Sequence, residues 1–336
     1  EYVKGPRVEA FEREFAAYCG VAHGVGTSSG TTALELLYRA YGIGPGDEVI
    51  VPANTSIATA MAVSNAGATP VVVDVDARTA NMDPNCVEQA ITSKTRAIVP
   101  VHLFGRPAAI SEIVEVARRR KLLVIEDASQ AHGARYDGKR VGSFGDAAAF
   151  SLHPSKVLNA YGDAGIVVTN DARIAQVVRE LRDIGQVARY VHHRVGTNAR
   201  LDEIQAAMLS VKLRRLDTWI DRRRAVAERY ARRFAGTKVV AQAFSDREFC
   251  VFHLYVVQLA NRDAVCAALD RAEIDWGIHY PTPIQYQRAY RQAAIFTHPT
   301  PVADALSHRI LSIPMFAELT PEEVDRVADV VLDAAD

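Results

Sequence analysis

The chain has 336 residues, of which 49% are hydrophobic and 24% are charged, with a formal net charge of −1. This length allows one large domain and a smaller one, while the balanced charge argues against nucleic acid or an anionic membrane as a partner and leaves a small molecule. The four cysteines lack CxxC spacing and no apolar run has membrane-spanning length, so we expect neither a metal site nor a disulfide framework, but a protein of the reducing cytoplasm.

The first predicted elements are a helix and a phosphate-binding turn. Helical spacing of apolar residues from Val8 to Tyr18 predicts an amphipathic helix that ends at Gly20. A turn of small and hydroxyl residues, 24–32, then leads into a second helix. Free backbone N–H groups and the positive dipole at a helix N-terminus favour a bound phosphate, so this turn predicts a phosphate cradle.

Short apolar strands alternate with helices between residues 48 and 126. The expected strands are 48–51, 70–75, 97–101 and 122–126, and the expected helices are 57–65, 85–91 and 111–119. Strands without polar alternation, separated by helices, predict a mostly parallel sheet covered on both faces, and therefore an α/β fold. Ligands bind beyond the carboxyl ends of such strands. The residues found there are 54–56, Asp74, His102, Asp127 and Gln130.

Asp127 lies at the end of an apolar strand, where a carboxylate is expected to be partly buried. A buried carboxylate needs a cationic or N–H partner. One interpretation is that Asp127 holds a protonated ring nitrogen of a ligand. The alternative is that Asp127 caps the turn that follows.

The stretch from Phe150 to Gly165 places a lysine in an unusual position. A buried strand is expected to end at Phe150, and Lys156 follows among hydroxyl residues, a proline and glycines. Partial desolvation there would lower the pKa of the amine and make it a nucleophile able to form a Schiff base with a carbonyl. For a lone lysine in such a loop, the alternative is a solvated charge.

The remaining sequence predicts a second, smaller unit. A strand at 166–169, a helix at 172–183 and a polar loop at 189–200 come first. One long helix with an arginine-rich outer face is expected over 201–234. A strand at 252–259 and helices at 263–272 and 320–336 follow. We therefore expect a large domain over residues 1–215 and a small C-terminal α/β domain over residues 216–336, which includes the linking helix.

Five stretches together resemble one protein family. They are Ser-Ser-Gly-Thr-Thr-Ala-Leu from Ser28, Glu-Asp-Ala-Ser-Gln-Ala-His-Gly-Ala from Glu126, Phe-Ser-Leu-His-Pro-Ser-Lys from Phe150 with Gly-Asp-Ala-Gly behind it, Gly-Thr-Asn-Ala-Arg-Leu-Asp-Glu-Ile-Gln-Ala-Ala from Gly196, and Gly-Ile-His-Tyr-Pro from Gly277. In this order they resemble the DegT/StrS group of sugar aminotransferases, fold-type-I enzymes that use pyridoxal 5′-phosphate (PLP). The resemblance implies a fold-type-I large domain whose mostly parallel sheet lies between helices.

The resemblance implies a role for each matching residue. Lys156 looks like the amine that forms the Schiff base with PLP and then carries the proton. Asp127 looks like the carboxylate that keeps the pyridine nitrogen protonated, and Gln130 like the partner of the ring's 3′-oxygen. The phosphate is expected to contact Gly30, Thr31, Thr32 and Ser151 and, from the partner subunit of a homodimer with shared sites, Asn198.

The chain departs from the family pattern where the sugar is expected to bind. Ser56 stands where the family usually has an aromatic that stacks on the ring, and Gln285 and Gln258 replace a usual His and Arg. Ser56, Gln285, His279 and Tyr280 are the candidate substrate residues. Members of the family usually carry further residues before the position of the first residue here, so we expect the natural chain to begin earlier.

The resemblance implies transfer of an amino group from glutamate to a keto-sugar, in the biosynthesis of amino sugars for antibiotics or glycans. Residues 153–165 favour a dTDP-3-keto-6-deoxyhexose; a 4-keto nucleotide sugar and a keto-cyclitol are alternatives. A sugar dehydratase usually has His in place of Lys156, and a non-catalytic regulator with the PLP fold has no need of it. An NAD-dependent oxidoreductase is a further alternative, because 24–30 is near a dinucleotide fingerprint, but no apolar strand is expected before Gly24.

Overall fold

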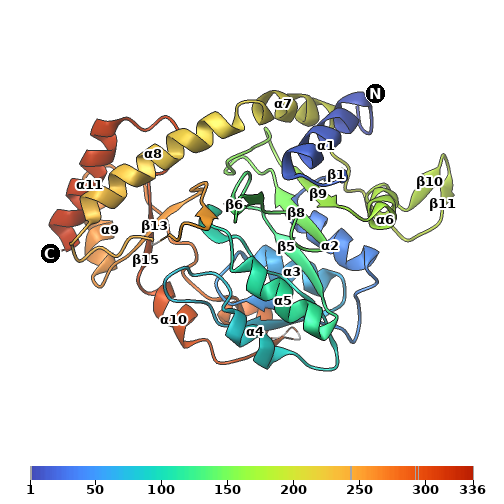
Figure 1. Ribbon diagram of the computed structural model, residues 1–336, viewed down its shortest axis with the longest axis horizontal. Coiled ribbons are helices and arrows are strands. Elements are labelled where there is room, and N and C mark those ends of the chain that lie inside the picture. Colours follow the sequence, from blue (N-terminus) through green and yellow to red (C-terminus); the bar gives the residue numbers. More distant parts are fainter. Residues whose placement is uncertain (1, 243, 292, 294, 336) are drawn as a thin grey trace.

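The computed structural model describes residues 2–242, 244–291, 293 and 295–335. Within these ranges the largest sheet has eight strands in the order β1-β9-β8-β5-β4-β2-β3-β14 (Figure 1). The strands are β1 (His23–Thr27), β9 (Gly165–Thr169), β8 (Ala147–Ser151), β5 (Leu123–Asp127), β4 (Thr95–Ile98), β2 (Glu48–Pro52), β3 (Thr69–Val73) and β14 (Phe296–Thr297). Neighbours from β8 to β14 are parallel, and β9 is antiparallel to both β8 and β1. The predicted α/β fold with a mostly parallel sheet is confirmed.

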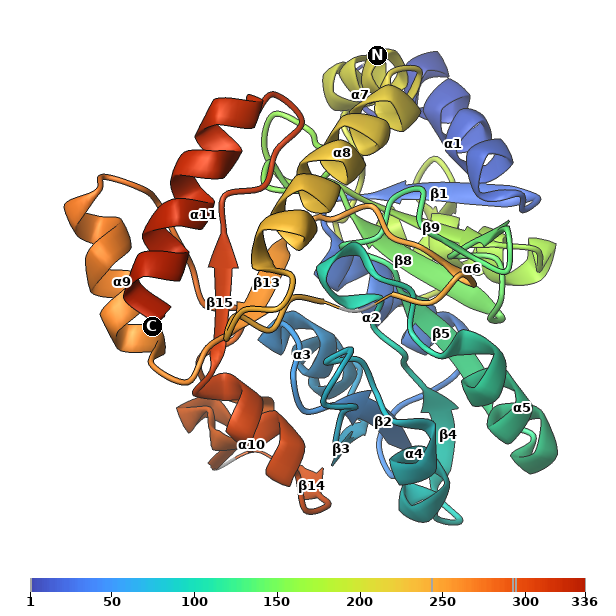
Figure 2. The same cartoon turned by 60° about the vertical axis from the view of Figure 1, so that its left-hand side comes forward.

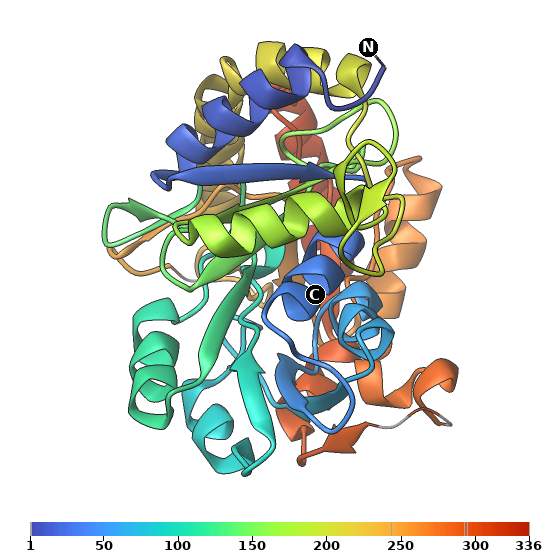
Figure 3. The ribbon, with the colours of Figure 1, turned by 90° about the vertical axis from the view of Figure 1, so that its right-hand side faces the viewer.

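Helices cover both faces of this sheet, as expected for strands that are apolar throughout. On one face lie α2 (Gly30–Ala40), α3 (Ile57–Asn65) and α6 (Ala172–Arg182). On the other lie α1 (Pro6–Cys19), α4 (Pro84–Ala90), α5 (Ile110–Arg120) and α7 (Glu203–Leu213). Successive residues of a strand point to opposite faces of the sheet. In β2, Val49 and Val51 pack with α2 and α3, whereas Ile50 packs with α4 and α5. Figure 3 shows α6 lying alongside the sheet next to β1.

Strand β1 runs through a segment that the sequence predicts to be a turn. The prediction is wrong here because Gly24 and Gly26 allow close packing of a strand rather than a change of chain direction. A Cβ at Gly24 would lie 2.4 Å from the carbonyl oxygen of Glu12, and one at Gly26 would lie 2.7 Å from the side chain of Leu201. A strand therefore does lead through Gly24. Unlike the first strand of a dinucleotide-binding fold, it is an antiparallel edge strand.

The single long helix predicted over 201–234 is two helices, α7 and α8 (Leu216–Phe234). The break lies at Arg214 and Arg215, where no glycine or proline marks it in the sequence. The change from one core to another comes later, within α8, because Leu216 and Ile220 still pack in the core of α7. The buried residues of α7 pack with α1, whereas Tyr230 and Phe234 of α8 belong to a second core.

The second core surrounds β13 (Tyr255–Gln258) and β15 (Ile310–Ile313), an antiparallel pair covered by α8, α9 (Arg262–Arg271) and α11 (Pro321–Ala335). Figure 2 shows these helices on one side of the molecule, with α8 leading toward the large sheet. Residue 336 of the predicted last helix lies outside the described residues. The C-terminal part also supplies β14, which pairs with β3. The domain boundary at 215/216 stays a prediction.

Shorter elements complete the fold. They are β6 (Arg135–Tyr136), β7 (Lys139–Arg140) and β12 (Glu248–Phe249) in a small sheet, the hairpin β10 (Gln186–Ala188) and β11 (Val191–His192), α10 (Pro301–Ser307), and the 3-10 turns η1 (Leu103–Gly105), η2 (Ile284–Tyr286) and η3 (Arg288–Arg291). The β10–β11 hairpin, in the predicted polar loop, projects from the body of the molecule (Figure 1). Across the described ranges, no helix combines the length and the apolar character needed to cross a membrane.

Candidate active site

A small cavity lies at the carboxyl ends of the central strands, where the α/β fold predicts ligand binding. The beginnings of α2 and α3, the ends of β5 and β8 and the loop after β8 form its walls. Its lining residues are Gly30, Thr31, Leu34, Thr55, Ser56, Ala58, Val101, Asp127, Ser129, Gln130, Ser151 and Lys156. Seven of the residues singled out in the sequence therefore meet here, although they are up to 126 positions apart in the chain.

Lys156 lies in the loop that follows β8, and its side chain is half-buried. Burial lowers the pKa of Lys156 below its ordinary value, and the negative charge of Asp127 partly opposes that shift. The loop is fixed close to the strand end by a hydrogen bond from the Lys156 N–H to the carbonyl of His153 at 2.9 Å. A desolvated amine in this position can act as a nucleophile and as a proton carrier.

Asp127 ends β5 and is held from two sides. One carboxylate oxygen accepts a hydrogen bond from the hydroxyl of Thr59 at 2.8 Å, and the other accepts the N–H of Ser129 at 3.2 Å. Both interpretations from the sequence thus describe part of the geometry: Asp127 caps the next turn and also lines the cavity. The sequence analysis missed Thr59. Its signal is a four-residue spacing from Thr55 on a predicted helix, which brings the two hydroxyls within 3.2 Å.

Gln130 has an amide whose orientation is fixed by its partners. Its Oε1 accepts the N–H of Phe104 at 2.8 Å, so Nε2 is the side that remains to donate, and it donates to the hydroxyl of Tyr280 at 3.2 Å. Burial, with a smaller effect of Asp127, raises the pKa of Tyr280 to about 12. The predicted substrate residue Tyr280 therefore stays protonated beside Gln130.

The helix start at α2, where the sequence predicts a phosphate cradle, is shaped by glycine, and its contact with phosphate stays a prediction. A Cβ at Gly30 would lie 2.7 Å from the Cβ of Ser151, so only glycine allows this helix start to approach the end of β8 so closely. Thr32 differs from the prediction: it forms a capping box with Ser29, with bonds of 3.1 and 3.0 Å, and does not line the cavity. Gly30, Thr31 and Ser151 do line it.

Two other predicted substrate residues have different surroundings. Ser56 lines the cavity and caps α3 by accepting the N–H of Ala58 at 3.3 Å. Gln285 does not line the cavity but donates to the hydroxyl of Thr300 at 2.7 Å, close to the start of α10. The structure therefore gives Gln285 a structural partner, and its contact with the substrate stays a prediction. His279 bonds the Ser312 hydroxyl at 2.9 Å.

Strand-end residues that point away from the cavity have structural partners. Asp74 accepts two N–H bonds of 2.9 Å at the start of α10. His102 bonds Glu126 at 2.9 Å, and Gln258 donates to the carbonyl of Ala77 at 3.0 Å. Within the ranges that the structure describes, no group of three or more His, Cys, Asp or Glu residues could hold a metal ion.

Asn198 does not line the cavity of its own chain, and its side chain is exposed in the loop after β11. Its contact with a cofactor across subunits stays a prediction. The sequence analysis also missed His132, which is fully buried and has no partner for either ring nitrogen among the described residues. Burial and the charge of Lys156 lower the pKa of His132 to about 3, so that its ring is neutral.

The residues around the cavity fit PLP. A glycine-shaped helix start suits its phosphate, while a desolvated amine, a fixed carboxylate and an amide donor surround the same small space. This donor set supports the chemistry that the sequence analysis attributes to Lys156, Asp127 and Gln130.

The relatives of the chain include several sugar aminotransferases. One is the dTDP-3-amino-3,4,6-trideoxy-alpha-D-glucose transaminase of Streptomyces venezuelae, to which the chain is 44% identical. The match covers 100% of this chain and 89% of the relative. Another is the UDP-N-acetyl-3-dehydro-alpha-D-glucosamine 3-aminotransferase of Acidithiobacillus ferrooxidans, to which the chain is 47% identical. This match covers 98% of this chain and 89% of the relative.

Solved structures agree with these relatives. The crystal structure of S. venezuelae DesV in complex with a ketimine intermediate matches with a TM-score of 0.97 and 44% identity, over 100% of this chain and 91% of that one. Bacillus subtilis NtdA with bound cofactor PMP matches with a TM-score of 0.92 and 28% identity, over 100% of this chain and 78% of that one.

The predicted resemblance, enzyme class and PLP cofactor are confirmed, and the oxidoreductase alternative is wrong. Residues 1–332 match the model of one family of PLP-dependent enzymes. The chain belongs to the DegT/DnrJ/EryC1/StrS aminotransferase family.

Proposed function

We propose that this enzyme transfers an amino group from glutamate to C3 of a dTDP-linked 3-keto-6-deoxyhexose, in an amino-sugar pathway of the cytoplasm. The observation that carries the proposal is the single cavity where Lys156, Asp127 and Gln130 meet the glycine-shaped start of α2. When bound, PLP supplies the conjugated ring that takes up the electron pair left at the α-carbon of the amino donor.

Lys156 is the proposed nucleophile and general acid–base. Its lowered pKa makes the neutral amine available at a lower pH than in an exposed lysine. Its position in a short loop at the end of β8 keeps the amine over the cavity, where it can take a proton from one carbon and return it to another.

Asp127 is the proposed partner of the ring nitrogen. The hydrogen bonds from the Thr59 hydroxyl and the Ser129 N–H fix the plane of the carboxylate, and each of its oxygens accepts one of them. The carboxylate can then hold a proton at the nitrogen, which Asn could not do. Gln130, whose Oε1 is already used by the Phe104 N–H, offers Nε2 to the ring oxygen.

The names of two relatives support C3 as the position of amination. One acts in the formation of a dTDP-3-amino sugar and the other on a UDP-3-dehydro sugar, so the position agrees although the nucleotide differs. We choose dTDP because three relatives, 42–44% identical to this chain, are named as transaminases of dTDP-3-amino sugars.

A homodimer with shared sites is also part of the proposal. One chain encloses only about 80 Å³ of the cavity, whereas a pocket for an organic ligand usually measures about 300–1,000 Å³. Near the exposed Asn198, Tyr190 and Val195 are 78% and 87% exposed, which suits a contact surface. Four unpaired cysteines support the cytoplasm.

The substrate is tested with enzyme that has been loaded with amine from glutamate. The loaded enzyme is offered a 3-keto nucleotide sugar, a 4-keto nucleotide sugar and a keto-cyclitol in separate reactions, and the aminated products are identified by mass spectrometry and NMR. We expect amination of the 3-keto sugar, faster with dTDP than with UDP. Amination of only the 4-keto sugar or the cyclitol would overturn the position, and failure of glutamate to load the enzyme would overturn the donor.

A further inference from the structure

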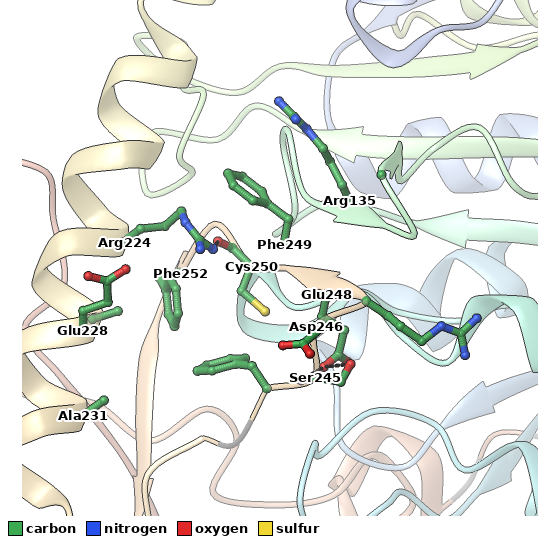
Figure 4. A pocket seen from close by; sticks show the side chains of 14 residues that line it. Arg135, Arg224, Glu228, Ala231, Ser245, Asp246, Glu248, Phe249, Cys250 and Phe252 are labelled. Carbon is green, nitrogen blue, oxygen red and sulfur yellow. Dashed lines mark hydrogen bonds between the residues drawn. The ribbon is translucent and has the colours of Figure 1, made fainter.

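A second cavity, of about 520 Å³, lies outside the candidate active site and shares none of its lining residues (Figure 4). One face of α8, the turn between β6 and β7 and the segment 244–252 form its walls. From α8 come Arg224, Ala227, Glu228 and Ala231, which the helical repeat places on one side of the helix. The volume lies within the range of about 300–1,000 Å³ that suits a small organic ligand.

Two arginines from separate elements flank one ring in this cavity. The guanidinium carbon of Arg224 lies 4.2 Å from the ring centroid of Phe249, and that of Arg135 lies 4.9 Å from it. Arg224 donates only to the carbonyl of Cys250, at 3.1 Å. The Nε of Arg135 is buried without a hydrogen-bond partner, and neither arginine has an ion pair within the described ranges. Neither charge is therefore compensated by a carboxylate of the described residues, and a bound anion would supply that compensation.

The other charges of the cavity are paired or in water. Arg247 binds Asp137 through bonds of 2.8 and 2.6 Å, and Glu248 accepts bonds of 2.9 and 2.8 Å from Arg106. Two further carboxylates are exposed on the rim, where water and salt screen them; these are Glu228 and Asp246. Positive charge therefore dominates at the Phe249 end of the cavity.

The cavity also has a second, accessible aromatic ring, that of Phe244, over which the guanidinium carbon of Arg106 lies at 5.4 Å from the centroid. Phe244 is 38% exposed and packs edge-on against Phe252, with centroids 5.0 Å apart and an interplanar angle of 80°. Ala227 and Ala231 leave space beside it along α8. A flat ring can pack against Phe244 while a group attached to it reaches the two arginines.

We propose that this cavity binds a nucleotide, recognised as a flat heterocyclic ring that carries a phosphate or diphosphate, at a site separate from the active site. A diphosphate carries enough charge to compensate two guanidiniums, and a guanidinium can bind phosphate oxygens through two hydrogen bonds, whereas a single carboxylate would compensate only one of the charges. The two cavities share no lining residue, so a nucleotide bound here leaves Lys156 and its surroundings free. The site goes beyond the proposed function and does not depend on which sugar is aminated.

The test is calorimetric titration of the PLP-loaded full chain with thymidine diphosphate, with adenosine diphosphate as a second probe. Arg224→Met and Arg135→Met should each raise the Kd at least about tenfold, because each removes a charge-assisted hydrogen bond. Arg222→Met, an exposed arginine on the same helix that does not line the cavity, is the matched control and should leave the Kd unchanged. Thymidine alone and pyrophosphate alone should each bind more weakly than thymidine diphosphate.

Several outcomes would overturn this site. They are no binding of either diphosphate by the unmodified protein, equal Kd values for that protein and for both cavity variants, and equal weakening in Arg222→Met. Thermal unfolding of each variant checks the fold. If Arg135→Met unfolds, Arg224→Lys, which keeps the charge but loses the planar fork, should still weaken binding. Amino transfer is assayed in parallel, and a protein that binds the diphosphate here but transfers no amine would contradict only the proposed function.

Discussion

The reactivity of Lys156 depends on two opposing effects on one pKa. Burial lowers the pKa of this lysine, and the charge of Asp127 raises it. Asp127→Asn removes the second effect with little change in shape, so we expect Lys156 to lose its proton at a lower pH than in the unmodified enzyme. The rate at which an amine-reactive reagent labels Lys156 in PLP-free protein, measured by peptide mapping across a pH series, gives the midpoint.

Asp163→Asn is the control for this measurement, since Asp163 is exposed in the same loop region and does not contribute to the pKa of Lys156. Its labelling midpoint should stay where it is in the unmodified protein. A midpoint that remains unchanged or rises in Asp127→Asn would show that the two side chains are not coupled as the structure describes. The same variant, with PLP added, should lose most transfer activity, because an amide cannot hold the ring nitrogen protonated.

The contact between α2 and β8 sets the shape of the phosphate cradle. Gly30→Ala places a Cβ 2.7 Å from the Cβ and 2.9 Å from the Cα of Ser151, so the helix start or the strand end must move. We expect a loss of about 1–3 kcal/mol in the free energy of unfolding. The Kd for PLP should rise at least about tenfold, because its phosphate contacts depend on position at the level of an ångström. Fluorescence titration and thermal unfolding measure the two effects.

Gly44→Ala is the matched control for the cradle. A Cβ there would make an ordinary contact of 3.5 Å with a carbonyl oxygen, and Gly44 does not line the cavity. Stability and PLP affinity should remain close to those of the unmodified protein. An unchanged PLP affinity in Gly30→Ala, with the fold intact, would argue against this helix start as the phosphate site.

The whole-molecule prediction is that the active site needs two chains. Lys156→Ala removes the nucleophile, and Asn198→Asp places a negative charge where the partner's phosphate is expected, so each protein alone should be inactive. In a mixed dimer, one of the two sites has both an intact Lys156 and an intact Asn198. Mixing equal amounts of the two variants under conditions of subunit exchange should therefore restore activity, up to about a quarter of that of the unmodified protein if assembly is random.

Two controls accompany the mixing experiment. Exchange is verified with differently tagged chains, and light scattering measures the mass of the assembly. Activity that does not return in verified mixed dimers, or a protein that is monomeric and active, would contradict the shared site. An active Asn198→Asp parent would contradict the role of Asn198 alone.

Local patterns in the sequence determined the fold class and most of the elements that carry the site. Apolar runs separated by helical repeats place β5 and β8 in a covered parallel sheet, so Asp127 and Lys156 are expected beyond strand ends. The glycine of the helix start and the five ordered motifs point to PLP and to amino transfer. The sequence alone indicates these features because strand, helix and turn preferences act over a few neighbouring residues.

Only the tertiary structure decided how distant segments meet. Thr59 donates a hydrogen bond to Asp127, and Gln130 donates one to Tyr280. The sequence does not indicate the contact between Gln130 and Tyr280, because such pairs depend on the packing of separate elements. β1 depends on the close approach of Gly24 and Gly26 to Glu12 and Leu201, and no glycine or proline marks the break between α7 and α8 in the sequence. The pair Arg135 and Arg224 beside Phe249 arises in the same way, since 89 residues separate the two arginines.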